Sequence, residues 1–189
     1  MDSLAQIFGS LGRVKLLRLF LFNRHEGFDF ETVLSRAKLS SAEAKTELAR
    51  LMHAGVVKRS GSTRTGIYRA NQRFVHLEAL SAFIRSTTVI PPGDLLARVK
   101  KAGNVKLVIL SGVFTGVAES GADLIVVGDR LDERSLARAA ATIEAELGRE
   151  IRYASFSTDD FSYRMGIYDR LIRDVFDYPH QILLDKIGL

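Results

Sequence analysis

The chain has 189 residues, of which 47% are hydrophobic and 26% charged, so it is long enough for one large domain or two small ones. It contains no cysteine, which excludes disulfides, thiol catalysis and cysteine-ligated zinc, and its four histidines show no metal-ligand spacing. No apolar run reaches the roughly 18 residues of a membrane span, and the N-terminus lacks the pattern of an export signal. We therefore expect a cytoplasmic protein with no metal, no cofactor and no membrane partner.

The net charge of +5 is divided unevenly along the chain. Residues 1–73 hold 13 Lys/Arg against 6 Asp/Glu, a balance of +7, whereas residues 74–189 hold 14 against 16, a balance of −2. A basic half attracts polyanions, so nucleic acid is the expected partner of residues 1–73. The alternative is that these basic residues only solvate a surface.

The chain begins with a helical region whose centre is strongly apolar. A helix is expected over 10–23, with Ser10 as its cap. Because it is apolar over most of its circumference, this helix would form the centre of a small domain. A turn and a short helix over 31–39 follow it.

A capped helix and a hairpin complete the basic half. The third helix is expected to start at Ser40 or Ser41, and Gly55 closes it. Two β-prone arms then surround a tip of Gly, Ser, Thr and Arg, which predicts a β-hairpin over 56–71.

Residues 74–104 have the pattern of a helical connector. The double proline at 91–92 cannot lie inside a helix, and it marks the expected boundary between domains. The predicted organisation is a first domain over 1–73, this connector, and a second domain over 105–189.

The second half alternates between strands and helices. Its strands are apolar throughout and have a helix between two of them, which indicates a mixed sheet covered by helices and an α/β fold, α+β for the whole chain. The expected strands lie at 104–113, 122–129 and 150–157, the expected helices at 132–148 and 159–176, and a C-terminal segment follows at 179–189.

The order of helix, short helix, capped helix and basic hairpin resembles a winged helix-turn-helix. The matching stretches are "SSAEAKTELARLMHAGVVKR" and "VVKRSGSTRTGIYRAN", and the resemblance is to the winged-helix domains of bacterial and archaeal transcription regulators. It implies that the third helix enters the major groove of double-stranded DNA and that the hairpin, the wing, contacts phosphates or the minor groove.

Helical spacing divides the third helix into two faces. Ala44, Leu48 and Leu51 are expected to face the core, which leaves small and basic residues on the opposite face. The expected DNA-binding residues of the third helix and the wing are Ser41, Lys45, Thr46, Lys58, Arg59, Ser62, Thr63, Arg64 and Arg69.

Two acids of the third helix oppose this interpretation. Glu43 and Glu47 would repel phosphates if they pointed into the groove, unless they pair with Arg50 or Lys45 at helical spacing. Winged helices that bind protein, or that serve only in dimerisation, are the alternative.

Residues 105–165 resemble the small nucleotidyltransferases of the polymerase-beta superfamily. In that family a Gly-Ser turn holds the nucleotide phosphates, and three acids on two later strands hold divalent metal. Here the turn is the reversed pair Ser111-Gly112, Gly121 stands at the first acid position, and only Asp123 remains. The strand over 150–157 has no acid at the third position.

A lone carboxylate cannot assemble a two-metal site, so we expect no catalytic residue and no metal. Asp123 is expected to survive as a turn or surface residue, with Ser111, Gly112 and Asp123 forming a degenerate nucleotide pocket. Nucleotide binding without turnover is the less favoured alternative, because no Lys or Arg lies between 107 and 129 to neutralise phosphates.

A regulator that reads DNA usually pairs two copies on adjacent half-sites, so a homodimer is expected. The apolar residues of the tail are first interpreted as core packing, with a self-association surface as the alternative. The dimer interface could use the segment 3–8, or the tail through Tyr168, Leu171, Ile172 and Val175, with the tail preferred of the two. The function expected is a transcription regulator whose second domain serves dimerisation, partner contact or ligand sensing. The alternatives are a nucleotidyltransferase acting on protein or nucleic acid and a non-DNA adaptor of a toxin–antitoxin-like pair.

Overall fold

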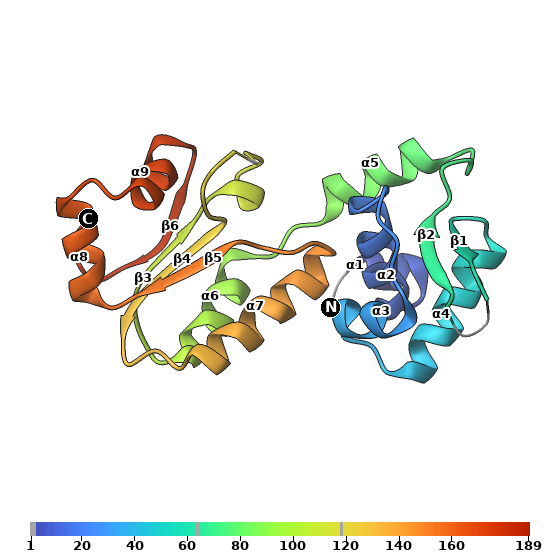
Figure 1. Cartoon of the computed structure of the whole chain (residues 1–189), viewed down its shortest axis with the longest axis horizontal. Coiled ribbons are helices and arrows are strands. Elements are labelled where there is room, and N and C mark those ends of the chain that lie inside the picture. Colours follow the sequence, from blue (N-terminus) through green and yellow to red (C-terminus); the bar gives the residue numbers. More distant parts are fainter. Residues whose placement is uncertain (1–2, 63–64, 118) are drawn as a thin grey trace. The chain divides into compact units, whose positions relative to one another are not determined.

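The computed structural model describes residues 3–62, 65–117 and 119–189, and it divides into two compact units (Figure 1). The N-terminal unit comprises Met1–Ile90 and Thr142–Glu150, and the C-terminal unit comprises Pro91–Ala141 and Ile151–Leu189. Helices combine with a two-stranded and a four-stranded sheet, which confirms the predicted α/β class, α+β overall. Within the described ranges, no helix is long and apolar enough to cross a membrane.

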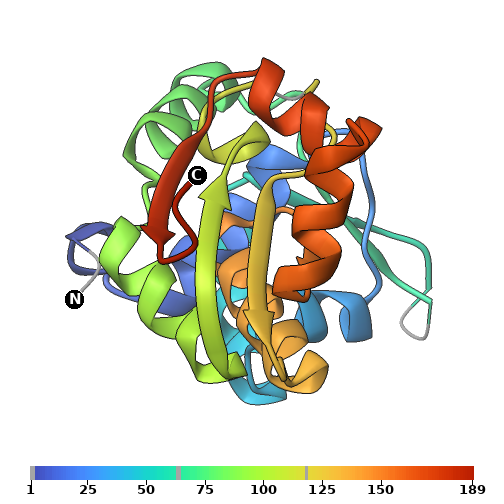
Figure 2. The same cartoon turned by 90° about the vertical axis from the view of Figure 1, so that its left-hand side faces the viewer.

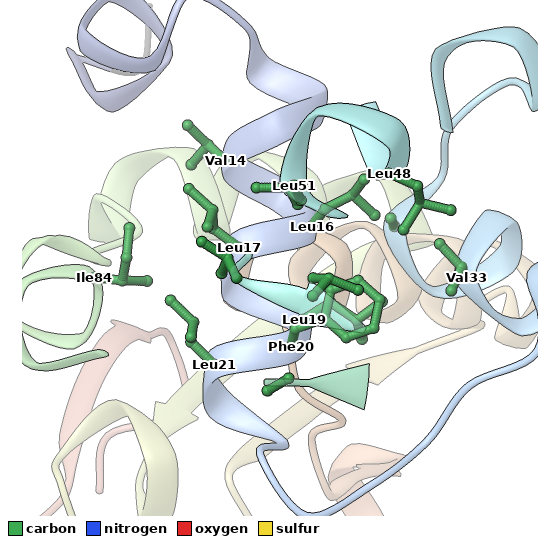
Figure 3. Packing of buried hydrophobic residues seen from close by; sticks show 14 of the residues in the cluster. Val14, Leu16, Leu17, Leu19, Phe20, Leu21, Val33, Leu48, Leu51 and Ile84 are labelled. Carbon is green, nitrogen blue, oxygen red and sulfur yellow. The ribbon is translucent and has the colours of Figure 1, made fainter. Parts of the chain in front are cut away.

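The N-terminal unit is built around one central helix. Its elements are α1 (Ser3–Phe8), α2 (Leu11–Phe22), α3 (Phe30–Ala37), α4 (Ser41–His53), β1 (Val57–Ser60), β2 (Ile67–Ala70) and α5 (Leu77–Thr87). Apolar residues of α2 are buried on several sides at once, and α3, α4 and α5 contribute Val33, Leu48, Leu51 and Ile84 around it (Figure 3). A helix without a polar face must be surrounded, which explains the central place of α2.

Short polar residues start these helices where the sequence indicates. Ser10 accepts a hydrogen bond from the Arg13 backbone N–H and caps α2. Ser40, rather than Ser41, caps α4, and it forms a reciprocal capping box with Glu43. After α4, Gly55 adopts a φ of +77°, the left-handed conformation that ends a helix.

The predicted hairpin is present, and a third segment of the chain pairs with its second strand. Strands β1 and β2 are antiparallel, with Val57 opposite Ala70 and Lys58 opposite Arg69. Phe28 makes an isolated antiparallel bridge to Tyr68, so β2 has a neighbour on each side. This bridge ties the wing to the segment before α3.

Residues 74–104, which were predicted to form a helical connector, are divided between the two units. Helix α5 belongs to the N-terminal unit, where its Ile84 is fully buried against the core of α2. Helix α6 (Pro92–Val99) belongs to the C-terminal unit and begins at the second proline of the pair, where a missing N–H costs nothing. Within this stretch, the division between the units falls between Ile90 and Pro91.

The C-terminal unit holds a four-stranded mixed sheet in the order β5-β4-β3-β6. Strand β3 lies antiparallel to both β4 and β6, and β4 lies parallel to β5 (Figure 2). The elements that follow α6 are η1 (Lys100–Ala102), β3 (Asn104–Leu110), η2 (Gly112–Phe114), β4 (Leu124–Asp129), α7 (Glu133–Leu147), β5 (Tyr153–Phe156), α8 (Thr158–Gly166), α9 (Arg170–Asp177) and β6 (Gln181–Asp185). Helix α7 is divided, because its residues from Thr142 onward belong to the N-terminal unit. Strand β6 lies in the segment for which no strand was predicted.

The tail contains both buried and exposed apolar residues. Ile172 and Val175 are buried against one face of the sheet, in a core that includes Ile109 and Ile125. Core packing, the favoured interpretation of the tail, is therefore confirmed for Ile172 and Val175, and these two side chains are not free to form the interface considered for them. Tyr168 remains 81% exposed.

Candidate nucleic-acid interface

Helix α4 presents the two faces that its sequence predicts. Ala44, Leu48 and Leu51 are buried, which confirms the expected core side. The predicted contact residues Ser41, Lys45 and Thr46 are all exposed on the other side. The Thr46 hydroxyl donates to the Ala42 carbonyl at 3.0 Å, so this hydroxyl is already satisfied within the helix.

Neither acid of α4 lies exposed and unpaired on this face. The Glu43 carboxylate accepts hydrogen bonds from the backbone N–H and the hydroxyl of Ser40, and these bonds lower its pKa. The Glu47 side chain is only 7% exposed and pairs with both Arg13 and Arg50. Of the two partners considered for Glu47 on its own helix, the structure has Arg50 rather than Lys45. These pairs answer the objection for Glu47, whose charge two arginines balance, whereas Glu43 keeps its negative charge at the exposed start of the helix.

The register of the hairpin separates its basic residues. Val57 and Ala70 are paired and buried, so the face that carries them points inward. Side chains alternate along a strand, which puts the pair Arg59–Tyr68 on that same face and the pair Lys58–Arg69 on the opposite, exposed one. Like charges directly opposite each other in a sheet are destabilising. The Lys58–Arg69 pair is therefore a cost to the hairpin unless an anion lies against it.

A groove of about 550 Å³ lies between the start of α3, Lys45 of α4 and the inner side of the wing. Two cations line it, and each lies over an aromatic ring: Lys45 is 5.7 Å from the centroid of Phe30, and Arg59 is 5.7 Å from that of Tyr68. The lining residues are Asp29, Phe30, Glu31, Lys45, Arg59, Thr65, Gly66, Ile67 and Tyr68. The fold thus brings Lys45 of the third helix and Arg59 of the wing together.

The tip of the wing is only partly described. The backbone carbonyl of Ser62 accepts a hydrogen bond from Arg59 at 3.0 Å, and the Ser62 hydroxyl bonds that of Thr65 at 2.9 Å. The predicted contacts Thr63 and Arg64 lie outside the described residues.

Two arginines of this region, Arg13 and Arg50, were not among the residues predicted to contact DNA. Arg50 carries a detectable signal, its i,i+3 spacing from Glu47. Arg13 carries none, because it lies 34 positions from Glu47 in sequence and only folding brings the two together.

Ser111, Gly112 and Asp123, which were predicted to form a degenerate nucleotide pocket, are all buried. Asp123 is only 1% exposed, so its assignment to the surface is wrong, whereas it does lie in a bend, immediately before β4. Its carboxylate accepts from the backbone N–H groups of Val113 and Arg152, at 2.9 and 2.7 Å, and from the Arg152 guanidinium at 3.0 Å. Burial raises the pKa of Asp123, but these hydrogen bonds and the charge of Arg152 outweigh burial and lower it.

The turn beside Asp123 packs closely against the carboxylate and is hydrogen-bonded within its own unit. The Ser111 hydroxyl, which is buried, lies within hydrogen-bond distance of the Ser120 hydroxyl and the Pro179 carbonyl. A Cβ on Gly112 would lie 2.0 Å from a carboxylate oxygen of Asp123, so carboxylate and turn are in close contact. Among the described residues, no group of three or more His, Asp or Glu could hold a metal ion.

Comparisons of the chain with protein-family models, with curated proteins and with solved structures find no match. The function is therefore inferred from the residues and the geometry described above.

Proposed function

We propose that the chain is a DNA-binding protein of the cytoplasm that regulates transcription, and that its N-terminal unit contacts double-stranded DNA as a winged helix. The observation that carries this proposal is the composition of the exposed face of α4. Small and basic residues occupy that face, while Glu43 is used in the capping box and Glu47 is buried. After its first turn, such a helix presents no unbalanced carboxylate to an anionic groove, and only Glu43 in the first turn keeps its negative charge.

The wing supports the same partner. Lys45, Lys58, Arg59 and Arg69 are exposed cations on α4 and the hairpin, and Lys58 and Arg69 repel each other in the absence of an anion. The major groove, about 12 Å wide, admits an α-helix, and phosphate oxygens on its borders accept hydrogen bonds from Arg and Lys.

Binding to a fluorescently labelled 30-base-pair duplex is expected to weaken steeply with salt. Each neutralised phosphate contributes about −0.9 to the slope of log K against log salt, so the four cations predict a slope steeper than roughly −3. Fluorescence anisotropy between 50 and 300 mM NaCl measures it. The absence of binding at 50 mM NaCl would contradict the proposed DNA binding.

We further propose that the C-terminal unit does not transfer nucleotides. Incubation with each labelled nucleoside triphosphate and Mg²⁺ or Mn²⁺ is expected to label neither the protein nor added DNA, because the hydrogen bonds of Asp123 occupy the oxygens a metal would need. Gel electrophoresis followed by autoradiography checks this, with an active nucleotidyltransferase as the positive control. Metal-dependent labelling would contradict it.

The proposal includes pairing of two copies, since one winged helix contacts only a few base pairs. Of the two apolar segments considered for pairing, the tail keeps Tyr168 exposed, and α1 keeps Ile7 exposed at 70% while Leu4 is buried. Phe8 packs near Phe83, with ring centroids 6.4 Å apart. The C-terminal unit would serve such pairing, contact a partner or sense a ligand.

A further inference from the structure

The exposed face of α4 has a basic residue on each of its borders. Successive residues of a helix are rotated by about 100°, so Arg50 lies about 140° around α4 from Lys45. Ala42, Thr46 and Ala49 lie between these two positions, and all of them are exposed. Lys45 is on the side of the wing, because both line the same groove. Arg50 therefore marks the border away from the wing.

Arg50 is held in place through a buried carboxylate. Glu47 receives the Arg50 Nη1 on one oxygen and the Arg13 Nε on the other, each at 2.8 Å. Arg13 also donates to the Phe8 carbonyl at 2.6 Å, and the Ser10 side chain hydrogen-bonds Glu47. The network joins the start of α2 to α4, so the positions of both guanidinium groups depend on Glu47.

The network keeps a net positive charge that solvent can reach. Burial raises the pKa of Glu47, but hydrogen bonds from Arg13 and Ser10 and the charges of both arginines outweigh it, so the pKa is lowered and the carboxylate stays ionised. Two guanidinium groups on one carboxylate leave one positive charge. The Arg50 side chain is 56% exposed and that of Arg13 is 24% exposed. A guanidinium has several N–H groups in a planar fork that matches phosphate.

We propose that Arg50 and Arg13, oriented by Glu47, form a second phosphate-binding site for the DNA strand that the wing does not contact. A helix in the major groove lies between two phosphate backbones. Lys45 and the wing would contact one backbone, and Arg50 with Arg13 the other. Glu47 is a positioning residue in this arrangement. The inference rests on the proposed DNA binding and adds the second strand to it.

Replacing Arg50 by alanine tests the site directly. One lost phosphate contact makes the salt slope shallower by about 0.9, which corresponds to roughly eightfold weaker binding at 0.1 M salt relative to a 1 M reference. Arg13 still neutralises Glu47 in this variant, so the fold is retained, as circular dichroism will verify. Lys101→Ala is the matched control, because Lys101 is an exposed cation of the C-terminal unit.

Substitution of the two acids of α4 distinguishes a positioning role of Glu47 from a simple effect of its negative charge. Removing a negative charge near DNA should tighten binding, which is the result expected for Glu43→Gln, since glutamine also serves in a capping box. Glu47→Gln is expected to weaken binding instead, by an amount approaching that of Arg50→Ala, because both arginines lose their anchor. Thermal melts establish that each variant is folded at the assay temperature.

The outcomes distinguish this inference from the proposed function. A wild-type chain that binds the duplex with a steep salt slope, together with an Arg50→Ala variant of unchanged affinity and slope, overturns the second phosphate site and leaves DNA binding intact. Tighter binding by Glu47→Gln overturns the positioning role. A wild-type chain that binds no duplex overturns the proposed function itself.

Discussion

Replacing Asp123 by asparagine is expected to lower the free energy of unfolding of the C-terminal unit by about 3 kcal/mol. Removing one partner of a buried ion pair costs about 3–5 kcal/mol, and the lower end applies because the Arg152 side chain is 51% exposed. The asparagine amide would also put N–H groups opposite the donors of Val113 and Arg152. Urea denaturation followed by far-UV circular dichroism measures the change, since the chain has no tryptophan.

A surface aspartate supplies the control for this variant. Asp177 is 65% exposed and lies 3.8 Å from Arg173, so Asp177→Asn should change stability by less than about 0.5 kcal/mol. Because the folded-state pKa of Asp123 is lowered, its contribution is present above its ordinary value of 3.8 and is lost as the pH falls below it. The difference between wild type and Asp123→Asn should therefore shrink in acid. Equal stability of both proteins at pH 7 would refute the structural role of this carboxylate.

The double substitution Lys58→Thr, Arg69→Thr is expected to weaken DNA binding without weakening the fold. Loss of two phosphate contacts makes the salt slope shallower by about 1.8 and the affinity at 0.1 M salt roughly 60-fold lower. The hairpin loses a like-charge pair and gains two β-prone residues, so its melting temperature should be unchanged or higher. Anisotropy titrations and thermal melts on the same preparations compare the two effects.

The matched control is Lys100→Thr, Lys101→Thr, which removes the same charge from exposed positions of the C-terminal unit. Its DNA affinity should fall far less than that of the wing variant. Equal loss in both double variants would show that only the total charge matters. A lower melting temperature of the wing variant alone would show that Lys58 and Arg69 stabilise the hairpin rather than bind an anion.

Local signals made most of the N-terminal unit predictable. The capping residues Ser10 and Ser40 act within three positions of themselves, and the hairpin closes between neighbouring strands. Strand alternation, applied to the adjacent residues Lys58 and Arg59, would also have separated the two faces of the wing before the structure was known.

The contacts that the sequence did not predict join residues that lie far apart along the chain. Asp123 and Arg152 lie 29 positions apart, and Arg13 and Glu47 lie 34 apart, so no periodicity relates the members of either pair. A clue to the burial of Asp123 was present, because it adjoins the apolar run Leu124–Val127, where an ionised carboxylate requires partners. The same distance hid β6, whose partner β3 lies more than 70 positions earlier in the sequence.

The pairing of β6 with β3 has a consequence for the order in which the protein matures on the ribosome. Strand β3 is apolar from Leu107 to Leu110, and its second edge stays open until Gln181–Asp185 emerges. An open apolar edge is a template for pairing with other chains. The caps and the hairpin of the basic half need no such distant partner. The nascent chain therefore carries its aggregation-prone edge for most of the time during which the C-terminal unit is synthesised.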